Sequence, residues 1–293
     1  HSERINALAI SEDGSTVFSA GNDETIMAWN AKGYQKVGEQ NDQILDLEIR
    51  GNELFSAGRE RDIFVWDVQK LTQKKRLQGH EYHLEDLDIS LEKGWLASAS
   101  RDNSVKVWNI NNQNSHKIDG HPADVKAVAI SPNGEFIAST DAHKTLRIWK
   151  LNGRELFKKM NGRSLVRHIA FSNDGKYLVA ATGKNITVWE TENWTLKTRL
   201  RGHHSKITDL KFHPDGQHLA TCSEDRKVIF WNIETGRVQF SFVPHKGQRV
   251  IALAISKNGK TFATASLNKE IKIWEVQLLK RDLARSFDTN SSN

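Results

Sequence analysis

The sequence lacks several features on which common protein classes depend. A single cysteine, Cys222, excludes an internal disulfide framework and is typical of a reducing compartment. No apolar run approaches the ~18 residues of a membrane-spanning helix, and no signal peptide opens the chain. No Pro/Ser-rich linker or block of like charge interrupts the 293 residues. We therefore expect a soluble, cytoplasmic protein that makes no membrane contact.

Motifs of common catalytic and cofactor-binding classes are also missing. The chain has no Gly-x-x-x-x-Gly-Lys-Ser/Thr loop for nucleotide phosphates and no Gly-x-Ser-x-Gly elbow for a serine nucleophile. Its Asp/Asn-Gly turns lack the acidic spacing of a calcium loop. The densest histidine cluster contains His203, His204, His213 and His218, but no second cysteine or helical histidine pair completes a zinc set. We expect no metal, no cofactor and no enzymatic activity in this segment.

The charge balance and the first residue bear on partners. Lys and Arg number 42 against 36 Asp and Glu, which gives a formal charge of +6 and a pI near 9.3. This mild excess weakly favours acidic partners and does not establish nucleic-acid binding. The chain begins with His1 rather than Met. We therefore expect a fragment or processed product of a longer protein, whose upstream part is a possible site of catalytic chemistry.

The stretch SASRDNSVKVWNI, residues 98–110, is the clearest copy of a unit that recurs seven times. It predicts a strand, a turn that carries Asp102 and a second strand that closes on Trp108. Each copy adds short β-branched runs separated by Asp/Asn-Gly turns, so the unit is a small antiparallel sheet. The closing tryptophans lie 37 to 43 residues apart, a spacing typical of stacked repeats. They are Trp29, Trp66, Trp108, Trp149, Trp189, Trp231 and Trp274.

The repeated unit resembles the WD-repeat β-propeller family. Its third copy, residues 78–109, contains Gly-His, an apolar strand, a turn, a Ser-rich strand, and Asp before a strand that ends in Trp. The family's terminal Trp-Asp pair occurs literally only at Trp66-Asp67. The resemblance implies an all-β, seven-bladed β-propeller of four-stranded antiparallel blades over residues 1–276. Residues 277–293 would form the outer strand of the last blade, or a short helix, followed by a polar tail.

The resemblance also implies a hydrogen-bond network inside each blade, which satisfies a buried Trp N–H, a hydroxyl and an imidazole. Several copies depart from it: Gln40 and Glu60 substitute in the second, His143 stands where Asp is expected in the fourth, Asn268 replaces Asp in the seventh, and the fifth retains only Trp189. The network is complete in the first, third and sixth copies, as His1, Ser19, Asp23, Trp29; His80, Ser98, Asp102, Trp108; and His203, Thr221, Asp225, Trp231.

Ser, His and Asp also form the triads of hydrolases. Three similar networks in one chain favour a structural role, and no nucleophile elbow accompanies any of them. We therefore predict no catalytic residue.

In this family, loops from every blade converge around the central channel, which implies a binding face. Among the corresponding positions, basic residues outnumber acidic ones by seven to three. The planar fork of Arg suits carboxylates and phosphates, so an acidic peptide or phosphopeptide is the leading ligand class. The alternative is that these cations are solvated or pair with Glu85, Asp124 and Glu224. The predicted face residues are Arg4, Asn22, Leu45, Arg59, His83, Glu85, Arg101, Lys126, Arg167, Lys206, Glu224 and Arg249.

Three classes of function follow. The leading hypothesis is a monomeric, noncatalytic protein-interaction module, a scaffold or sensor part of a larger signalling or regulatory protein, which binds an acidic protein or an upstream domain of its own polypeptide. A nucleic-acid-binding propeller is favoured by the basic face but disfavoured by the lack of stacking aromatics in the ring. A propeller enzyme is the weakest hypothesis, because each polar cluster has a structural role.

Overall fold

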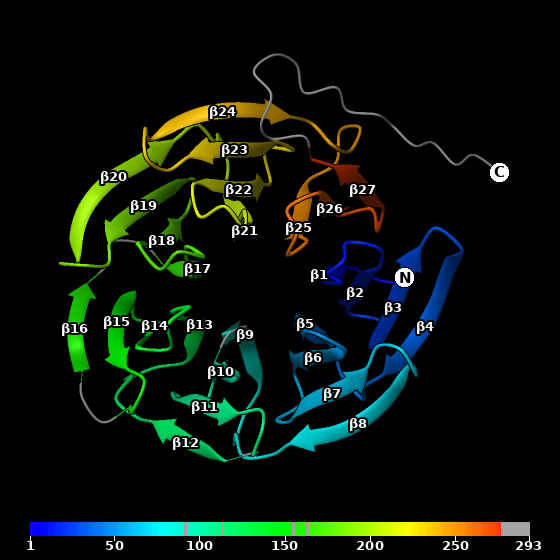
Figure 1. The fold of residues 1–293 in the computed structure, drawn as a ribbon, viewed down its shortest axis with the longest axis horizontal. Coiled ribbons are helices and arrows are strands. Elements are labelled where there is room, and N and C mark those ends of the chain that lie inside the picture. Colours follow the sequence, from blue (N-terminus) through cyan, green and yellow to red (C-terminus); the bar gives the residue numbers. More distant parts are fainter. Residues whose placement is uncertain (91–92, 113, 154–155, 162–164, 277–293) are drawn as a thin grey trace.

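The structure is a computed structural model, and the residues it describes are 1–90, 93–112, 114–153, 156–161 and 165–276. Its strands form seven antiparallel sheets arranged as blades around a central axis (Figure 1). The first strand of each blade lies innermost. Six blades have four strands, and the described part of the seventh has three. The predicted all-β, seven-bladed propeller is therefore confirmed.

The blades follow one another in chain order, and each is a simple meander. Blade 1 contains β1 (Ile5–Ile10), β2 (Val17–Gly21), β3 (Thr25–Asn30) and β4 (Gly33–Glu39), and blade 2 contains β5 (Ile44–Arg50), β6 (Glu53–Gly58), β7 (Ile63–Asp67) and β8 (Thr72–Leu77). Blade 3 contains β9 (Leu84–Ser90), β10 (Trp95–Ser100), β11 (Val105–Asn109) and β12 (Ser115–Ile118), and blade 4 contains β13 (Val125–Ile130), β14 (Phe136–Asp141), β15 (Thr145–Lys150) and β16 (Leu156–Asn161). Blade 5 contains β17 (Val166–Phe171), β18 (Tyr177–Thr182), β19 (Asn185–Glu190) and β20 (Thr195–Arg201). Blade 6 contains β21 (Ile207–Phe212), β22 (His218–Ser223), β23 (Val228–Asn232) and β24 (Arg237–Phe242), and blade 7 contains β25 (Val250–Ile255), β26 (Thr261–Ser266) and β27 (Ile271–Glu275).

The position of a strand within its blade explains its composition. The second strands, such as β10, are buried on both faces because a neighbouring blade covers each side, whereas the outer strand β24 is largely exposed. In five blades the hairpin between the first two strands turns through an Asp-Gly or Asn-Gly pair whose glycine has φ between 69° and 80°, a conformation that glycine adopts without strain. This turn is the Asp/Asn-Gly signature of the sequence. Its glycines are Gly14, Gly134, Gly175, Gly216 and Gly259.

Adjacent blades bury apolar side chains against each other. Between blades 1 and 2, for example, Phe18 and Ala28 belong to the same buried cluster as Leu54 and Trp66. The last blade closes the ring, because Ile5 and Leu8 of β1 pack in one cluster with residues of blade 7. Each blade therefore depends on its neighbours for its core.

The fourth strand predicted for blade 7 concerns residues 277–293, which lie outside the described residues. In the part of the chain that the structure describes, no helix is long and apolar enough to cross a membrane.

Candidate functional site

One end of the ring gathers the face positions predicted from the sequence. In six blades the backbone N–H of the residue after the second strand donates to the carbonyl of a residue just before the first strand, at 2.8 to 3.0 Å. We call the surface formed by these residues, together with Leu45, Glu85, Lys126 and Arg167, the loop face. The bonded pairs are Asn22 with Arg4, Arg59 with Gln43, Arg101 with His83, Ala142 with Asp124, Glu224 with Lys206 and Leu267 with Arg249.

Three of the seven cations on the loop face have acidic partners. Glu85 accepts hydrogen bonds from both Arg101 and Lys126, and the Lys126 Nζ lies 2.9 Å from oxygens of Glu85 and Asp124. Arg249 lies 3.9 Å from Glu224, at the limit of an ion pair. The ion pairs that the sequence analysis gave as the alternative are thus present for these three cations.

The other four cations, Arg4, Arg59, Arg167 and Lys206, are exposed, and none makes an ion pair within the described residues. They come from blades 1, 2, 5 and 6 and therefore lie on different sides of the ring. The net positive potential of the loop face rests on these four side chains.

The remaining predicted face residues have more local roles. Asn22 accepts a hydrogen bond from Asn6, whose amide also bonds the Ile44 carbonyl of the next blade at 2.8 Å. Leu45 lines the central channel, and His83 is half-buried. These residues shape the loops and offer little charge.

Tyr82 on the loop face escaped the sequence analysis. Its side chain is 60% exposed, and its backbone carbonyl accepts a hydrogen bond from Ser100 at 3.1 Å. Exposed Tyr is common at protein interfaces because it combines a large apolar surface with a hydroxyl. The sequence could have indicated Tyr82 as a face residue, because it directly precedes His83, which was predicted to lie on this face.

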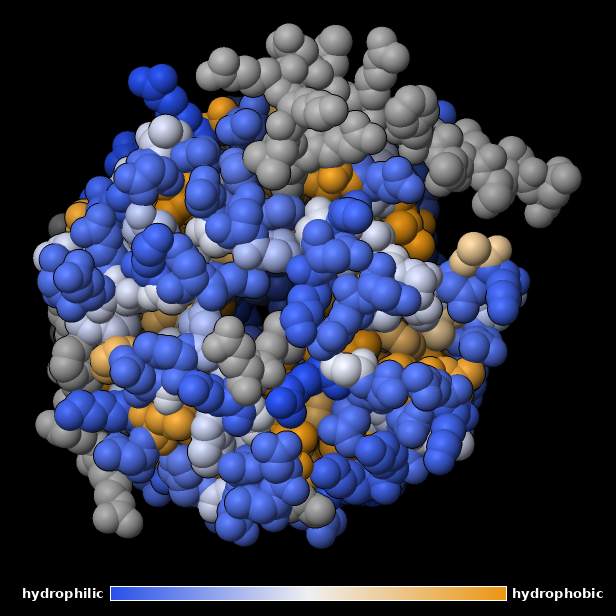
Figure 2. Space-filling view, viewed as in Figure 1, coloured by the Kyte–Doolittle hydropathy of each residue, from blue (hydrophilic) through white to orange (hydrophobic). Residues whose placement is uncertain are grey.

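The central channel opens at the middle of the ring and has a volume of about 760 Å³. Figure 2 shows a hollow at the centre of a surface on which hydrophilic residues predominate. Carboxylates from three blades line the channel, and Lys211 of blade 6 bonds Glu48 of blade 2 at 2.7 Å. The sequence analysis missed this acidic wall: Asp46, Glu48, Asp86, Asp88 and Asp209.

The four aspartates of this wall connect neighbouring blades. Each accepts, through its Oδ2, one backbone N–H from the inner strand of the next blade, at 2.7 to 2.9 Å. The inner strand is a sheet edge, so its N–H groups need partners from outside the sheet. The pairs are Asp46 with Leu87, Asp86 with Val128, Asp88 with Ile130 and Asp209 with Leu253.

Burial and the crowding of like charges raise the pKa values of carboxyl groups in the channel. Burial and then the Glu48 carboxylate raise the pKa of Asp88 to about 7, and burial raises the pKa of Asp209 to about 6. Burial, with Lys206 and Arg167 nearby, lowers the pKa of His168 to about 3. His168 is therefore neutral at pH 7, and the acidic wall carries less negative charge than its composition suggests.

The hydrogen-bond networks inside the blades have the geometry of a hydrolase triad. In blade 3, His80 Nε2 lies 2.7 Å from Ser98 Oγ, His80 Nδ1 lies 2.7 Å from Asp102 and Trp108 Nε1 donates to Ser98 at 2.9 Å. The Ser98 hydroxyl is fully buried and bonded to the indole, so no substrate reaches it. Blades 1 and 6 have the same contacts through His1, Ser19, Asp23, Trp29, and His203, Thr221, Asp225, Trp231.

Two blades that lack the expected acid contain another one. In blade 4 the prediction that His143 occupies the acid's place is wrong, because Asp141 at the buried end of β14 lies 2.8 Å from His121 Nδ1. In blade 7, Glu270 lies 2.8 Å from His245 Nδ1. In these two blades the acid does not lie at the usual distance in sequence from the closing Trp. A side chain from a nearby position of the same turn reaches the imidazole instead.

Blade 2 keeps only half of the network. Gln40 Nε2 and Trp66 Nε1 both donate to Ser56, at 2.5 and 2.8 Å. Within the described residues, Gln40 Oε1 and Glu60 Oε2 are buried without hydrogen-bond partners. This blade therefore has the least satisfied polar interior among those with a network.

Comparison with known proteins agrees with this architecture. A family model described as "WDHD1 first WD40 domain" matches residues 1–254, and one described as "WD domain, G-beta repeat" matches residues 236–275. Similar proteins include periodic tryptophan protein 2 of Arabidopsis thaliana, 32% identical over 31% of this chain and 10% of the relative. Others are pre-mRNA-processing factor 19 of Mus musculus, 28% identical over 33% and 20%, and the 66 kDa stress protein of Physarum polycephalum, 25% identical over 36% and 18%.

The aligned segments cover at most a fifth of these three relatives. The family model, in contrast, extends over most of this chain. From this match, the seven blades and the repeated His–Ser/Thr–Trp networks, the chain belongs to the WD40-repeat family of β-propellers.

Proposed function

We propose that this chain is a noncatalytic protein-interaction module that binds an acidic peptide or protein segment across the loop face. The observation that carries the proposal is the set of four exposed cations, Arg4, Arg59, Arg167 and Lys206, without ion pairs in the described structure. Exposed cations that point to solvent around one channel mouth attract a ligand of opposite charge and pair with its carboxylates. Membership of the WD40-repeat family supports a scaffold role.

The two types of cation have different roles in this proposal. Arg101 and Lys126 are already paired with Glu85 and Asp124, so they contribute to the shape of the face. Arg59 and Arg167 keep their guanidinium groups free for bidentate contacts. Tyr82 adds an exposed aromatic surface on the same face.

The full chain is tested against a fluorescent Glu/Asp-rich dodecapeptide by fluorescence anisotropy at about 0.1 M salt. We expect the double variant Arg59→Glu, Arg167→Glu to weaken binding at least tenfold. The matched control, Arg199→Glu with Arg237→Glu, has the same change of net charge on exposed positions of the outer strands β20 and β24, and we expect it to bind like wild type. Equal weakening in both double variants would show that net charge, not the loop face, drives binding.

The same assay separates the alternatives. Single-stranded DNA that binds more tightly than the peptide, with a steep salt dependence, would favour the nucleic-acid hypothesis. A reducing compartment such as the cytoplasm remains our proposal for location, because the only thiol, Cys222, is buried and free. A role in signalling or regulation, as one part of a longer protein, is likewise proposed from the interaction face.

A further inference from the structure

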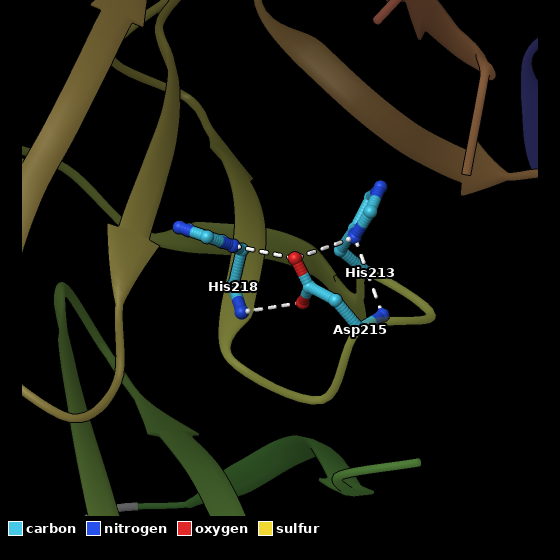
Figure 3. A group of neighbouring side chains, drawn as sticks. All are labelled: His213, Asp215 and His218. Atoms are coloured by element: carbon cyan, nitrogen blue, oxygen red, sulfur yellow. Dashed lines mark hydrogen bonds and ion pairs between the residues drawn. The ribbon is translucent and has the colours of Figure 1, made fainter. Parts of the chain in front are cut away.

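A compact group of metal-ligating side chains lies at the opposite end of blade 6 from the loop face. His213, Asp215 and His218 come from the turn that joins β21 to β22, and their nearest ligand atoms all lie within 4.8 Å of one another (Figure 3). The two histidines are buried, whereas the Asp215 side chain is 24% exposed. An ion could therefore enter past the carboxylate. We propose that this group binds a divalent transition-metal ion, Zn²⁺ being the best candidate.

The same turn in the other blades shows what is special about blade 6. Four turns begin with a serine whose Oγ donates to the Asp or Asn two residues later, at 2.6 to 2.7 Å. These serines also accept the N–H of the fifth residue after them. Blade 6 replaces the serine by His213 and places His218 at that fifth position. It therefore keeps the turn and adds two imidazoles to its carboxylate.

The hydrogen bonds of His213 leave one nitrogen directed at the carboxylate. Nε2 lies 3.1 Å from the Gly259 carbonyl of blade 7, so it carries the proton and donates to that oxygen. Nδ1 then has a lone pair, which accepts the Asp215 N–H at 3.3 Å, yet it lies 3.0 Å from Asp215 Oδ2. Two electron-rich atoms at this distance are held together by a shared cation, which is either a proton on Nδ1 or a metal ion, so this pair offers two ligand atoms to a metal that displaces the proton.

The surrounding contacts resemble those that orient metal ligands. A ligating histidine usually donates its other N–H to a carbonyl or carboxylate, as His213 does to Gly259. The second oxygen of Asp215 accepts the N–H groups of Gln217 and His218, at 2.9 and 3.0 Å, which holds the carboxylate in place. The remaining oxygen lies 2.7 Å from His218 Nδ1. Both imidazoles thus present Nδ1 to one carboxylate oxygen.

The ligand set suits Zn²⁺, which takes imidazole nitrogen and carboxylate oxygen at about 2.0 to 2.2 Å. Tetrahedral ligands at that range lie about 3.4 Å apart, so the carboxylate would withdraw by roughly half an ångström from each imidazole. On binding, the metal replaces the proton at His218 Nδ1, and Nε2 takes up a proton from solvent, so the imidazole stays neutral. Three protein ligands leave the fourth position to water.

Zinc chloride titrated into the chelator-treated, tag-free chain at pH 7.5, followed by calorimetry, tests the site. We expect one saturable Zn²⁺ per chain. His213→Ser and Asp215→Asn reproduce Ser131 and Asn133 of blade 4, so both variants keep a turn that this fold already contains. Each should weaken Zn²⁺ binding at least tenfold, while the exposed His204→Ala control should bind like wild type.

Cobalt replacement gives a second readout. Co²⁺ in a tetrahedral site should produce visible absorption bands that the His218→Thr variant, which copies Thr261 of blade 7, loses. Saturable binding that survives in His213→Ser or Asp215→Asn, or no saturable binding by wild type, would overturn the proposal. Thermal unfolding of each variant in EDTA, expected to match wild type, shows that lost binding does not reflect lost folding.

Discussion

Replacing Ser98 by Ala tests the hydrogen-bond network of blade 3 at its centre. The Ser98 hydroxyl accepts the Trp108 indole N–H at 2.9 Å and lies 2.7 Å from His80 Nε2. Both partners are at most 5% exposed, so water does not replace the lost hydroxyl easily. Alanine fits the site sterically, because Ala180 stands at the corresponding position of blade 5. The change therefore removes hydrogen bonds without creating a clash.

The expected loss follows from two buried groups that lose their partner. An unsatisfied buried donor or acceptor costs about 1–3 kcal/mol, which gives about 2–6 kcal/mol for the indole N–H and the imidazole nitrogen together. Removal of a buried hydroxyl offsets part of this, because that group was itself costly to desolvate. We expect a net loss of about 3 kcal/mol in the free energy of unfolding.

Urea unfolding followed by tryptophan fluorescence measures the loss, and hydrogen exchange on β10 and β11 localises it. Ser98→Thr is the matched control, because Thr221 and Thr264 make the same contacts in blades 6 and 7, and it should stay within about 1 kcal/mol of wild type. An Ala variant within about 0.5 kcal/mol of wild type, with unchanged exchange in blade 3, would refute the reasoning.

Two further predictions concern the channel and the incomplete network. The pKa of Asp88 is raised in the folded chain to about 7, so its contribution to stability is present below the ordinary carboxyl pKa of about 4 and is lost as pH rises through 7. Because Asp88 lines a channel that is open to solvent, we expect this loss to be about 1–2 kcal/mol between pH 4 and pH 8, and urea titrations of Asp88→Asn should lack it; an identical pH dependence in the variant would contradict the assignment. In blade 2, Gln40→His with Glu60→Asp should recreate the imidazole–carboxylate pair of blade 3 and raise the free energy of unfolding by about 1–2 kcal/mol, whereas Gln40→His alone should not. A double variant no more stable than wild type would show that the two buried oxygens cost little.

Most of the fold was predictable because its signals are local. Period-two apolar strands, glycine turns and a tryptophan every 37 to 43 residues specify the blades, and each blade needs only its neighbours. The resemblance to WD-repeat propellers implied that Arg4, Arg59 and Arg167 lie at one end of the ring. The hydrogen-bond networks whose residues have the usual spacing, such as that of Ser98, could be assigned from their positions in the repeat.

The sequence analysis missed residues where several positions of one turn can place a side chain against the same histidine. Asp141 and Glu270 take the acid's role from positions that a fixed count from Trp does not indicate. Asp215 belongs to one of the Asp/Asn-Gly turns, and the sequence analysis did not consider it as a ligand although it lies between His213 and His218 in the sequence. Its environment includes a carbonyl from the next blade, to which His213 donates.

The sequence by itself determined the number of repeated units and their order, because hydrophobic periodicity and turn chemistry act over a few residues. Only the tertiary structure decided which charges are free. Glu85 of blade 3 neutralises Lys126 of blade 4, and Lys211 of blade 6 meets Glu48 of blade 2 across the channel. Pairing of this kind depends on distances between blades, and ring closure sets those distances.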